Sequence, residues 1–240
     1  MSKHSRWSKV KHQKGPADAK RAAVFTKMAR VITVAAREGG GDPNFNFKLR
    51  SAVDQALEAN LPKENIERAI KKGTGEIASE RIEEIVYEGF GPGGVAILVE
   101  ALTDNRNRTS SNIKHTFSVN GGNMAGSGAV QWMFERKAVV RLKGGAPAEE
   151  AELALIDAGA DDISTDDGEA TVVGAPDALA RLRDAALGLG FKVVSAGFEW
   201  SAKEKAGAVD GETREKLEAL LEALDEDEDV NAVYANYAVQ

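Results

Sequence analysis

The chain has 240 residues, of which 42% are hydrophobic and 29% charged, and its formal net charge is −7. That composition is typical of a globular protein, and the absence of cysteine excludes disulfides, thiolate nucleophiles and thiolate metal sites. No apolar run approaches the ~20 residues that cross a membrane. Residues 1–14 also lack the apolar segment of a secretory signal. We therefore expect a cytoplasmic protein with no membrane partner.

Charge is distributed unevenly along the chain. Up to Gly75 there are 16 Lys and Arg against 7 Asp and Glu, a balance of +9. The remainder holds 15 against 31, a balance of −16. A basic segment attracts polyanions, whereas an acidic remainder repels them and restricts how the molecule docks. A basic solubilising tail has the same composition, so charge alone leaves both interpretations open.

The first third of the chain predicts a small bundle of three helices. Pro16 occupies a favoured first helical position and a glycine run begins at Gly39, which predicts a helix between them. Two more helices are expected from about Phe47 to Ala59 and from Pro62 to just before Gly73. At 100° per residue the first helix separates an apolar stripe from a basic one, which consists of Lys20, Lys27, Arg30 and Arg37.

From Ile82 onward the pattern changes to strands and helices in alternation. Strands are expected over 81–90, 94–102, 129–135, 137–142, 170–174, 192–200 and 230–239. Helices are expected over 107–117, 148–158, 176–187 and 214–224. This order predicts small α+β sandwiches of the ferredoxin-like kind. The fold class we expect is therefore α+β multidomain, with an N-terminal helical bundle.

Three glycines, Gly89, Gly91 and Gly94, satisfy the spacing of a dinucleotide-binding loop. Such a loop must open a helix, but here an apolar, β-branched segment follows and Pro92 lies inside the turn. We therefore expect a connection between two strands. A nucleotide-dependent enzyme is only a remote alternative.

The segment DNRNRTSSN places two arginines at the start of a predicted helix, where cations oppose the helix dipole. A bound anion reverses that balance, so the segment is a candidate contact for phosphate or RNA. Alternatively, Glu83, Glu84 or Glu100 pairs with the arginines. Both interpretations stay open. The candidate residues are Arg106, Arg108, Thr109 and Ser110.

The opening segment is the strongest functional signal. Between Ser2 and Arg21 there are seven Lys and Arg and one acidic residue, and this segment continues into the basic stripe of the first helix. A continuous basic track of this kind suits phosphates. Trp7 can stack on a base, but we favour the alternative that it anchors its segment to the core. The candidate nucleic-acid contacts are Lys3, His4, Arg6, Trp7, Lys9, Lys11, His12, Lys14, Lys20, Lys27, Arg30 and Arg37.

The sequence offers no pattern typical of catalysis or metal binding. The three histidines are His4, His12 and His115, and none has the spacing of a transition-metal site. Ser111 and His115 lie four residues apart but lack an orienting acid. We therefore expect a protein that is not an enzyme, with no cofactor, no metal and no small-molecule substrate.

Several long motifs occur in a characteristic order. They are HSRWSKVKHQK, DAKRAAVFTKMARVITVAAREGGGDP, LPKENIERAIKKGTGE, YEGFGPGGVAILVEALTDNRNRT and GGNMAGSGAVQWMFERK. With these motifs the chain resembles the YebC family, whose relatives include the mitochondrial translational activator of cytochrome c oxidase. The resemblance covers nearly the whole chain and is least specific from about Gly144 to Leu187. It departs from many relatives near Gly15 and Pro16.

The resemblance implies three domains, with one α+β domain inserted into the other. The expected ranges are 1–78 for the basic helical domain, 79–134 plus 206–240 for the middle domain and 135–205 for the inserted one. Family members are described as transcriptional regulators that bind DNA, or as factors that act in translation at the ribosome, including at proline-rich stretches. Both roles imply a nucleic-acid partner.

Two physical considerations favour RNA and the ribosome over DNA. No helix-turn-helix with a glycine turn is evident, and Asn and Gln are sparse on the basic stripe. The sequence is therefore poorly equipped for direct readout of bases in the major groove, whereas recognition of shape and phosphate needs neither feature. We therefore expect a ribosome-associated translation factor, with a DNA-binding transcriptional regulator as the alternative.

Overall fold

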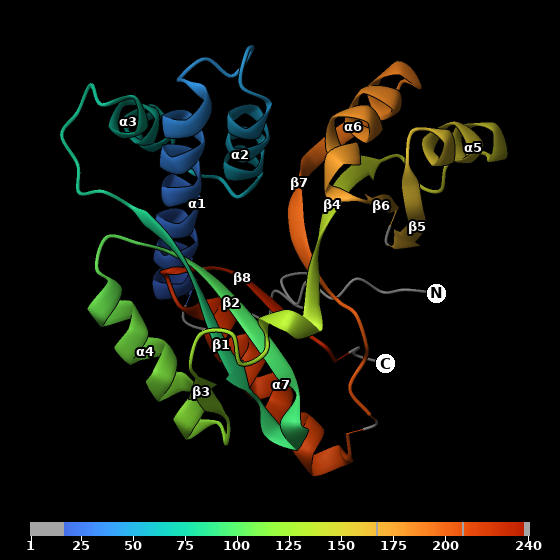
Figure 1. Cartoon of the computed structure of the whole chain (residues 1–240). Helices are drawn as coiled ribbons and strands as arrows, with labels where there is room; N and C mark the ends of the chain where they lie inside the picture. The colour runs from blue at the N-terminus through green and yellow to red at the C-terminus, as the bar shows by residue number, and fades with distance from the viewer. Residues whose placement is uncertain (1–16, 167, 208, 238–240) are drawn as a thin grey trace. The chain divides into compact units, whose positions relative to one another are not determined.

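The computed structural model describes residues 17–166, 168–207 and 209–237, and for residues 17–20 the backbone alone. The described residues form two compact units. One comprises Glu135–Ser201, and the other comprises the residues up to Phe134 and from Ala202 on. Figure 1 labels the helices and strands of both units. The three domain ranges expected from the sequence stay a prediction.

The three expected helices of the N-terminal region are confirmed. They are α1 (Ala17–Gly39), α2 (Phe47–Glu58) and α3 (Lys63–Thr74). Asn46 starts α2, because its side-chain oxygen accepts from the Leu49 amide at 3.0 Å. The side-chain amide of Asn46 also donates to the carbonyl oxygen of Ala35 at 2.8 Å, which ties α2 to α1. Buried side chains of all three helices, among them Ile32, Leu49 and Ile66, form one core.

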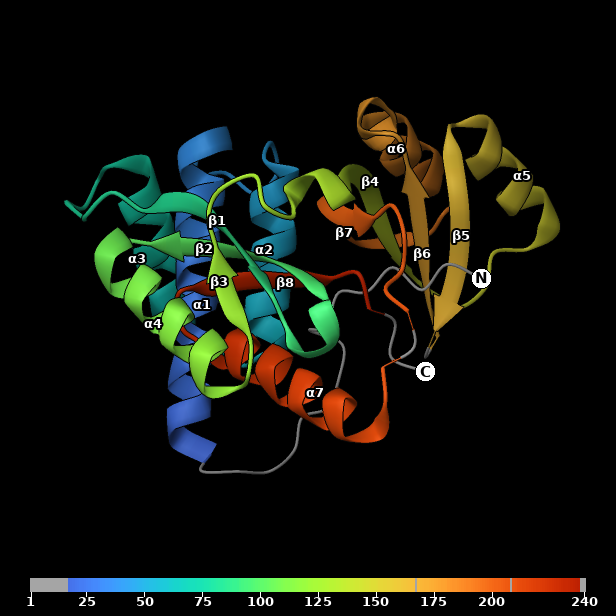
Figure 2. The ribbon, with the colours of Figure 1, turned by 60° about the horizontal axis from the view of Figure 1, so that its bottom comes forward.

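A four-stranded sheet follows in the order β3-β1-β2-β8. Its strands are β1 (Glu83–Phe90), β2 (Ala96–Thr103), β3 (Asn123–Ala125) and β8 (Val230–Ala235). Two helices, α4 (Arg106–Val119) and α7 (Gly211–Glu226), lie in front of this sheet in Figure 2, and α1 lies behind it. Alternate residues of β2, such as Ile97 and Val99, pack against Phe117 of α4 and Leu220 of α7. The sheet is therefore covered by helices on both faces.

The connections between the strands of this sheet test two predictions, namely the strand connection at the glycine motif and the insertion of one α+β fold into the other. Residues Pro92–Gly94 form a single 3-10 turn between β1 and β2, so the glycine motif joins two antiparallel strands, as predicted. Strand β8 comes from the end of the chain and pairs with β2, with Ile97 opposite Ala235. The strands of the second sheet lie between β2 and β8 in the sequence. One α+β fold is therefore inserted into another.

The inserted unit has its own sheet, in the order β5-β6-β4-β7. Its elements are β4 (Phe134–Lys143), α5 (Glu149–Asp157), β5 (Ala160–Asp166), β6 (Glu169–Gly174), α6 (Leu179–Gly188) and β7 (Lys192–Ala202). This βαββαβ order is ferredoxin-like. Buried side chains such as Val140, Val172 and Leu182 form its core. Phe198 and Trp200 of β7 both lie under the guanidinium of Arg136, at 5.4 and 5.6 Å to the ring centres.

One expected strand is wrong in position, and two strands were not expected. Residues 129–135 do not form a strand: Gln131–Met133 is a 3-10 helix and β4 begins at Phe134. The physical reason is that the carboxylate of Glu88 binds the amides of Val130 and Gln131, at 2.7 and 2.8 Å. The unexpected strands are β3, which has three residues in a glycine-rich segment, and β5, which is polar.

Among the described helices, none combines the length and the apolar character that a bilayer crossing requires.

Candidate functional site

Most of the predicted basic track lies outside the described residues. This applies to Lys3, His4, Arg6, Trp7, Lys9, Lys11, His12 and Lys14, and to the side chain of Lys20. Their role in binding nucleic acid stays a prediction. The structure does place the other three members of the basic stripe, Lys27, Arg30 and Arg37.

These three cations of α1 hold the helix to the rest of its unit. The ammonium of Lys27 donates to the carbonyl oxygen of Asp225, near the end of α7. The guanidinium of Arg30 donates to the carbonyl oxygen of Glu228 at 2.6 Å. Arg37 donates to the carbonyl oxygen of Ile82 at 2.7 Å. Each cation therefore has a structural partner, and a nucleic-acid contact by the same side chains would compete with it.

A buried carboxylate, that of Asp229, lies where α1, α4 and β8 meet. Its side chain is 0% exposed. It accepts from Arg108 at 3.0 Å and from the hydroxyl of Thr109 at 2.7 Å, and it forms an ion pair with Arg30 at 2.6 Å. The hydrogen bond to Asp229 is also the main reason that the pKa of Arg108 is raised. Two helices from different parts of the chain thus share one buried anion.

The groups bound to Asp229 include two of the four residues that the sequence predicts as phosphate contacts at the start of α4. Arg108 pairs with Asp229 and with Asp104 at 3.0 Å, rather than with the three glutamates considered from the sequence. Thr109 is fully buried, while Arg106 is exposed and Ser110 is partly exposed. The structure therefore brings Arg108 and Thr109 to an internal anion. A phosphate-binding role for the four residues stays a prediction.

Sequence reasoning missed a second basic surface, on α3. Arg68, Lys71 and Lys72 are all exposed, and their spacing of three and four residues places them on one side of the helix. Across the parts of the chain that the structure describes, no ion pair involves any of the three. The signal was present in the segment IERAIKKG, where these cations alternate with the buried Ile66 and Ala69.

A groove of about 510 Å³ lies between α1 and α3. Arg68 and Lys72 line it together with apolar atoms of Phe25 and Ala29. The acidic side chains of Glu80 and Asp104 also line the groove, and Asp104 is paired with Arg108. The basic face of α3 therefore borders a concave surface, with polar and apolar groups side by side.

The helices α1 and α3 approach closely beside this groove. A Cβ atom on Gly73 of α3 would overlap the carbonyl oxygen of Thr33 in α1. The hydroxyl of Thr33 donates to the carbonyl oxygen of Ala69 at 3.1 Å, so the contact is also hydrogen-bonded. The absence of a side chain at position 73 allows the backbones to meet, and this contact positions the basic face of α3.

Within the described ranges, His, Asp and Glu side chains do not gather in any group of three or more that would suit a metal ion.

The chain is similar to known proteins at three levels, namely family models, individual relatives and a solved structure. A family model described as the TACO1/YebC protein N-terminal domain matches residues 5–76, and one described as the TACO1/YebC second and third domain matches residues 82–237. A protein of Treponema denticola is 47% identical over 240 residues, covering 100% of this chain and 97% of the relative. A protein of Pelotomaculum thermopropionicum is 45% identical over 243 residues, covering 100% of both chains.

Both relatives carry the name "Probable transcriptional regulatory protein". A crystal structure of a conserved hypothetical protein, Aq1575 from Aquifex aeolicus, matches with a TM-score of 0.83 at 42% identity. The match covers 98% of this chain and 97% of that one. The similarity therefore extends over all the elements described above.

Proposed function

Because the chain belongs to the TACO1/YebC family, we propose that it is a non-enzymatic regulator of gene expression that acts by binding nucleic acid. The names of its relatives support a role in regulation. The charge balance of +9 up to Gly75 supports a polyanionic partner.

The observation that carries the proposal is the basic face of α3. Arg68, Lys71 and Lys72 are exposed on one side of α3, and none of them forms an ion pair within 4.0 Å among the described residues. Like charges three or four residues apart on a helix repel one another, and bound phosphates remove that cost by neutralising them. The cations of α1, in contrast, are committed to carbonyl groups and to Asp229.

We favour RNA, and the ribosome in particular, including action during the synthesis of proline-rich stretches. Asn and Gln, which read adenine in the major groove, are sparse around the basic face: Asn65 alone lies near it on α3. Recognition of RNA by shape and phosphate does not require such side chains. The acidic remainder of the chain then faces away from the RNA or meets protein.

A second candidate function, regulation of transcription through DNA, is favoured by one observation besides the names of the relatives. Helices α2 and α3 are joined by the four residues 59–62, and Asn60 has a φ of 62°. A helix-turn-helix often has glycine in such a turn because of this left-handed conformation, which asparagine also adopts. The absence of glycine therefore does not argue against a DNA-reading helix here.

The test is the binding of the full chain to purified bacterial 70S ribosomes and to duplex DNA, as a function of salt. The variant carries Arg68→Ala, Lys71→Ala and Lys72→Ala together. We expect weaker ribosome binding and a flatter dependence of log affinity on log salt, by about 0.7–0.9 for each phosphate that the variant no longer neutralises. Sequence-specific protection of a DNA fragment, without ribosome binding, would favour transcription instead.

The matched control removes three exposed cations elsewhere, Lys114, Lys143 and Lys192, so that the net charge changes equally. We expect its affinity and its salt slope to stay close to those of the unaltered chain. If both variants bind more weakly to the same degree, net charge decides binding and the α3 surface is not the site. If neither changes, the proposal is wrong for this helix.

A further inference from the structure

The segment between β3 and β4 presents a tryptophan to solvent. Trp132 is 68% exposed, although its neighbours Val130 and Phe134 are buried. Its indole Nε1 donates to the carbonyl oxygen of Ala129 at 3.1 Å. Because the only polar atom of the ring is already bonded, the exposed part of the side chain offers a partner aromatic surface.

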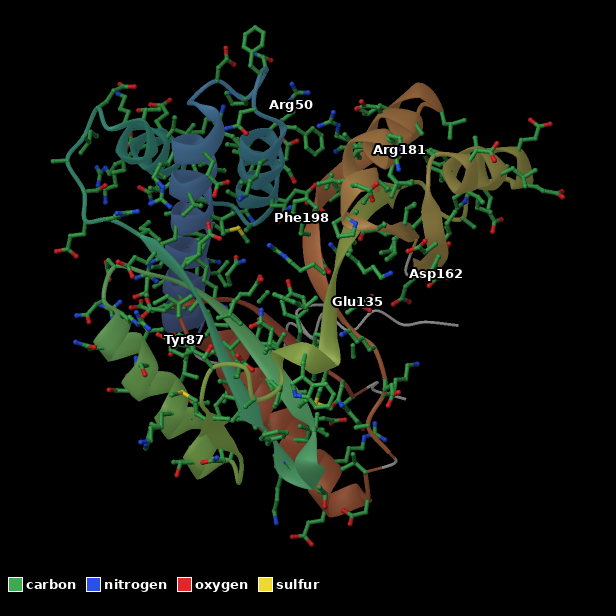
Figure 3. All side chains as sticks on the ribbon, in the orientation of Figure 1. Arg50, Tyr87, Glu135, Asp162, Arg181 and Phe198 are labelled. Carbon is green, nitrogen blue, oxygen red and sulfur yellow. The ribbon has the colours of Figure 1, made fainter. Side chains whose placement is uncertain are left out.

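The backbone that carries Trp132 is held in place by Glu88. This carboxylate is 3% exposed and accepts from the amides of Gly128 at 2.6 Å, Val130 at 2.7 Å and Gln131 at 2.8 Å. Gly128 has a φ of 83°, a left-handed conformation that glycine adopts without strain. Successive amides that converge on one anion form a rigid cradle. Figure 3 shows the side chains of the described residues on the ribbon.

The other side of the segment is held by Lys203. The amide of Lys203 donates to the carbonyl oxygen of Met133 at 2.9 Å, and its ammonium donates to that of Trp132 at 2.8 Å. The Lys203 ammonium is thus bonded directly to the backbone of Trp132. Of the apolar residues on either side of Trp132, Val130 and Phe134 are buried, so they do not extend the exposed surface of the ring.

We propose that Trp132 is a stacking site for an unpaired base of a single-stranded nucleic acid, with Lys203, which is exposed and has two further N–H donors, as the cation for the adjoining phosphate. This inference rests on the proposed function and adds the class of nucleic acid. A base in a duplex has both faces covered by its neighbours, whereas an unpaired base has faces free for an aromatic side chain. A rigid ring loses little entropy on binding, since Glu88 has already ordered its backbone.

An apolar protein surface is the competing occupant. It is less well matched, because the core of a protein interface is depleted of charged groups and gathers several apolar side chains. Here a lysine ammonium donates to the backbone carbonyl of the tryptophan, and the apolar neighbours Val130 and Phe134 are buried rather than exposed beside the ring. The combination of one aromatic ring with one cation is typical of single-strand binding.

The test measures the affinity of the full chain for three fluorescein-labelled probes: a 12-nucleotide oligoadenylate RNA, the same length of oligodeoxyadenylate, and a 12-base-pair RNA duplex. Trp132→Ala is expected to weaken binding of both single strands by about fivefold to a hundredfold. Its affinity for the duplex is expected to stay within about twofold, because duplex binding is dominated by phosphate contacts. Similar losses with RNA and DNA strands mean that the base stacks and the sugar is not read.

Two substitutions at the same position separate stacking from apolar contact. Trp132→Phe keeps an aromatic face and is expected to retain most of the affinity, whereas Trp132→Leu is expected to lose as much as Trp132→Ala. Retained affinity in Trp132→Leu would overturn the stacking proposal in favour of apolar contact. Unchanged single-strand affinity in Trp132→Ala would also overturn it.

A second readout is the intrinsic fluorescence on adding unlabelled oligoadenylate. We expect quenching in the unaltered chain and much less in Trp132→Phe, which keeps Trp7 and Trp200. Binding of the duplex or of ribosomes without any single-strand binding overturns only this inference. Failure to bind any nucleic acid overturns the proposed function together with it.

Discussion

Glu88 is a carboxylate buried in a sheet, with backbone amides as partners. Burial by itself raises the pKa of this group, but the hydrogen bonds from Gly128, Val130 and Gln131 together outweigh burial and lower it below its ordinary value. The charged form is therefore the one that the fold stabilises. One side chain orders a segment that propensity alone assigns to a strand.

Replacing Glu88 with Gln is expected to destabilise the chain by about 2–4 kcal/mol at neutral pH, because an amide NH₂ then faces backbone N–H groups and the charge is removed. Urea unfolding followed by circular dichroism measures the change.

The Glu88→Gln substitution also leads to a prediction about how stability depends on pH in acid. Since the folded pKa is lowered, the contribution of Glu88 is complete above the unfolded pKa and is lost as the pH falls through the folded pKa. The difference in stability between the two chains is therefore expected to shrink below about pH 4. An equal difference at pH 7 and pH 3 would contradict the assignment.

At the scale of elements, α1 is the helix that joins the N-terminal bundle to the first sheet. It packs against α2 and α3 through the core around Ile32, and its cations reach the turn between α7 and β8. Asp229 in this turn connects Arg30 of α1 with Arg108 of α4. The bundle and the sheet are thus joined by hydrogen bonds and by ion pairs to a shared carboxylate.

Removing the shared anion tests this junction. Asp229→Ala leaves Arg30, whose side chain is 11% exposed, without its carboxylate, so we expect a decrease of about 3 kcal/mol or more in the free energy of unfolding. Urea unfolding of the full chain gives the value.

The control is Asp225→Ala. The carboxylate of Asp225 lies 4.0 Å from the Lys27 ammonium and is 31% exposed, while the carbonyl group that accepts from Lys27 remains in the variant. Its decrease in stability is expected to be under about 1 kcal/mol. Equal decreases in the two variants would mean that Asp229 is no more than a surface partner.

At the scale of the whole molecule, the basic first part of the chain and its acidic remainder have different roles. The basic residues before Gly75 provide both structural anchors and exposed cations, while the acidic excess lies in the rest of the chain. An unevenly charged molecule approaches a polyanion in a limited set of orientations. The net charge of −7 therefore does not conflict with a nucleic-acid partner.

The basic opening segment and the face of α3 are expected to act together. Lys9→Ala, Lys11→Ala and Lys14→Ala in one chain should weaken binding to ribosomes and reduce the salt slope by up to about 0.9 for each phosphate left without its lysine. Combining them with the α3 substitutions should reduce the slope further, nearly by the sum of the two changes. Titration of binding at several salt concentrations measures both. An unchanged slope in the opening-segment variant would show that this segment does not bind phosphate.

The sequence by itself determined the three N-terminal helices, the strand connection at the glycine motif and the α+β class. These depend on local signals, namely apolar period, caps and turn residues, which act over a few residues. The family resemblance supplied the insertion. The tertiary structure decided the rest: Asp229 rather than a sheet glutamate as the partner of Arg108, the anchoring role of Arg30, and the 3-10 turn at Trp132. Each depends on groups that are distant in sequence, such as Glu88 and Gly128, and no local pattern records which buried anion will meet which donor.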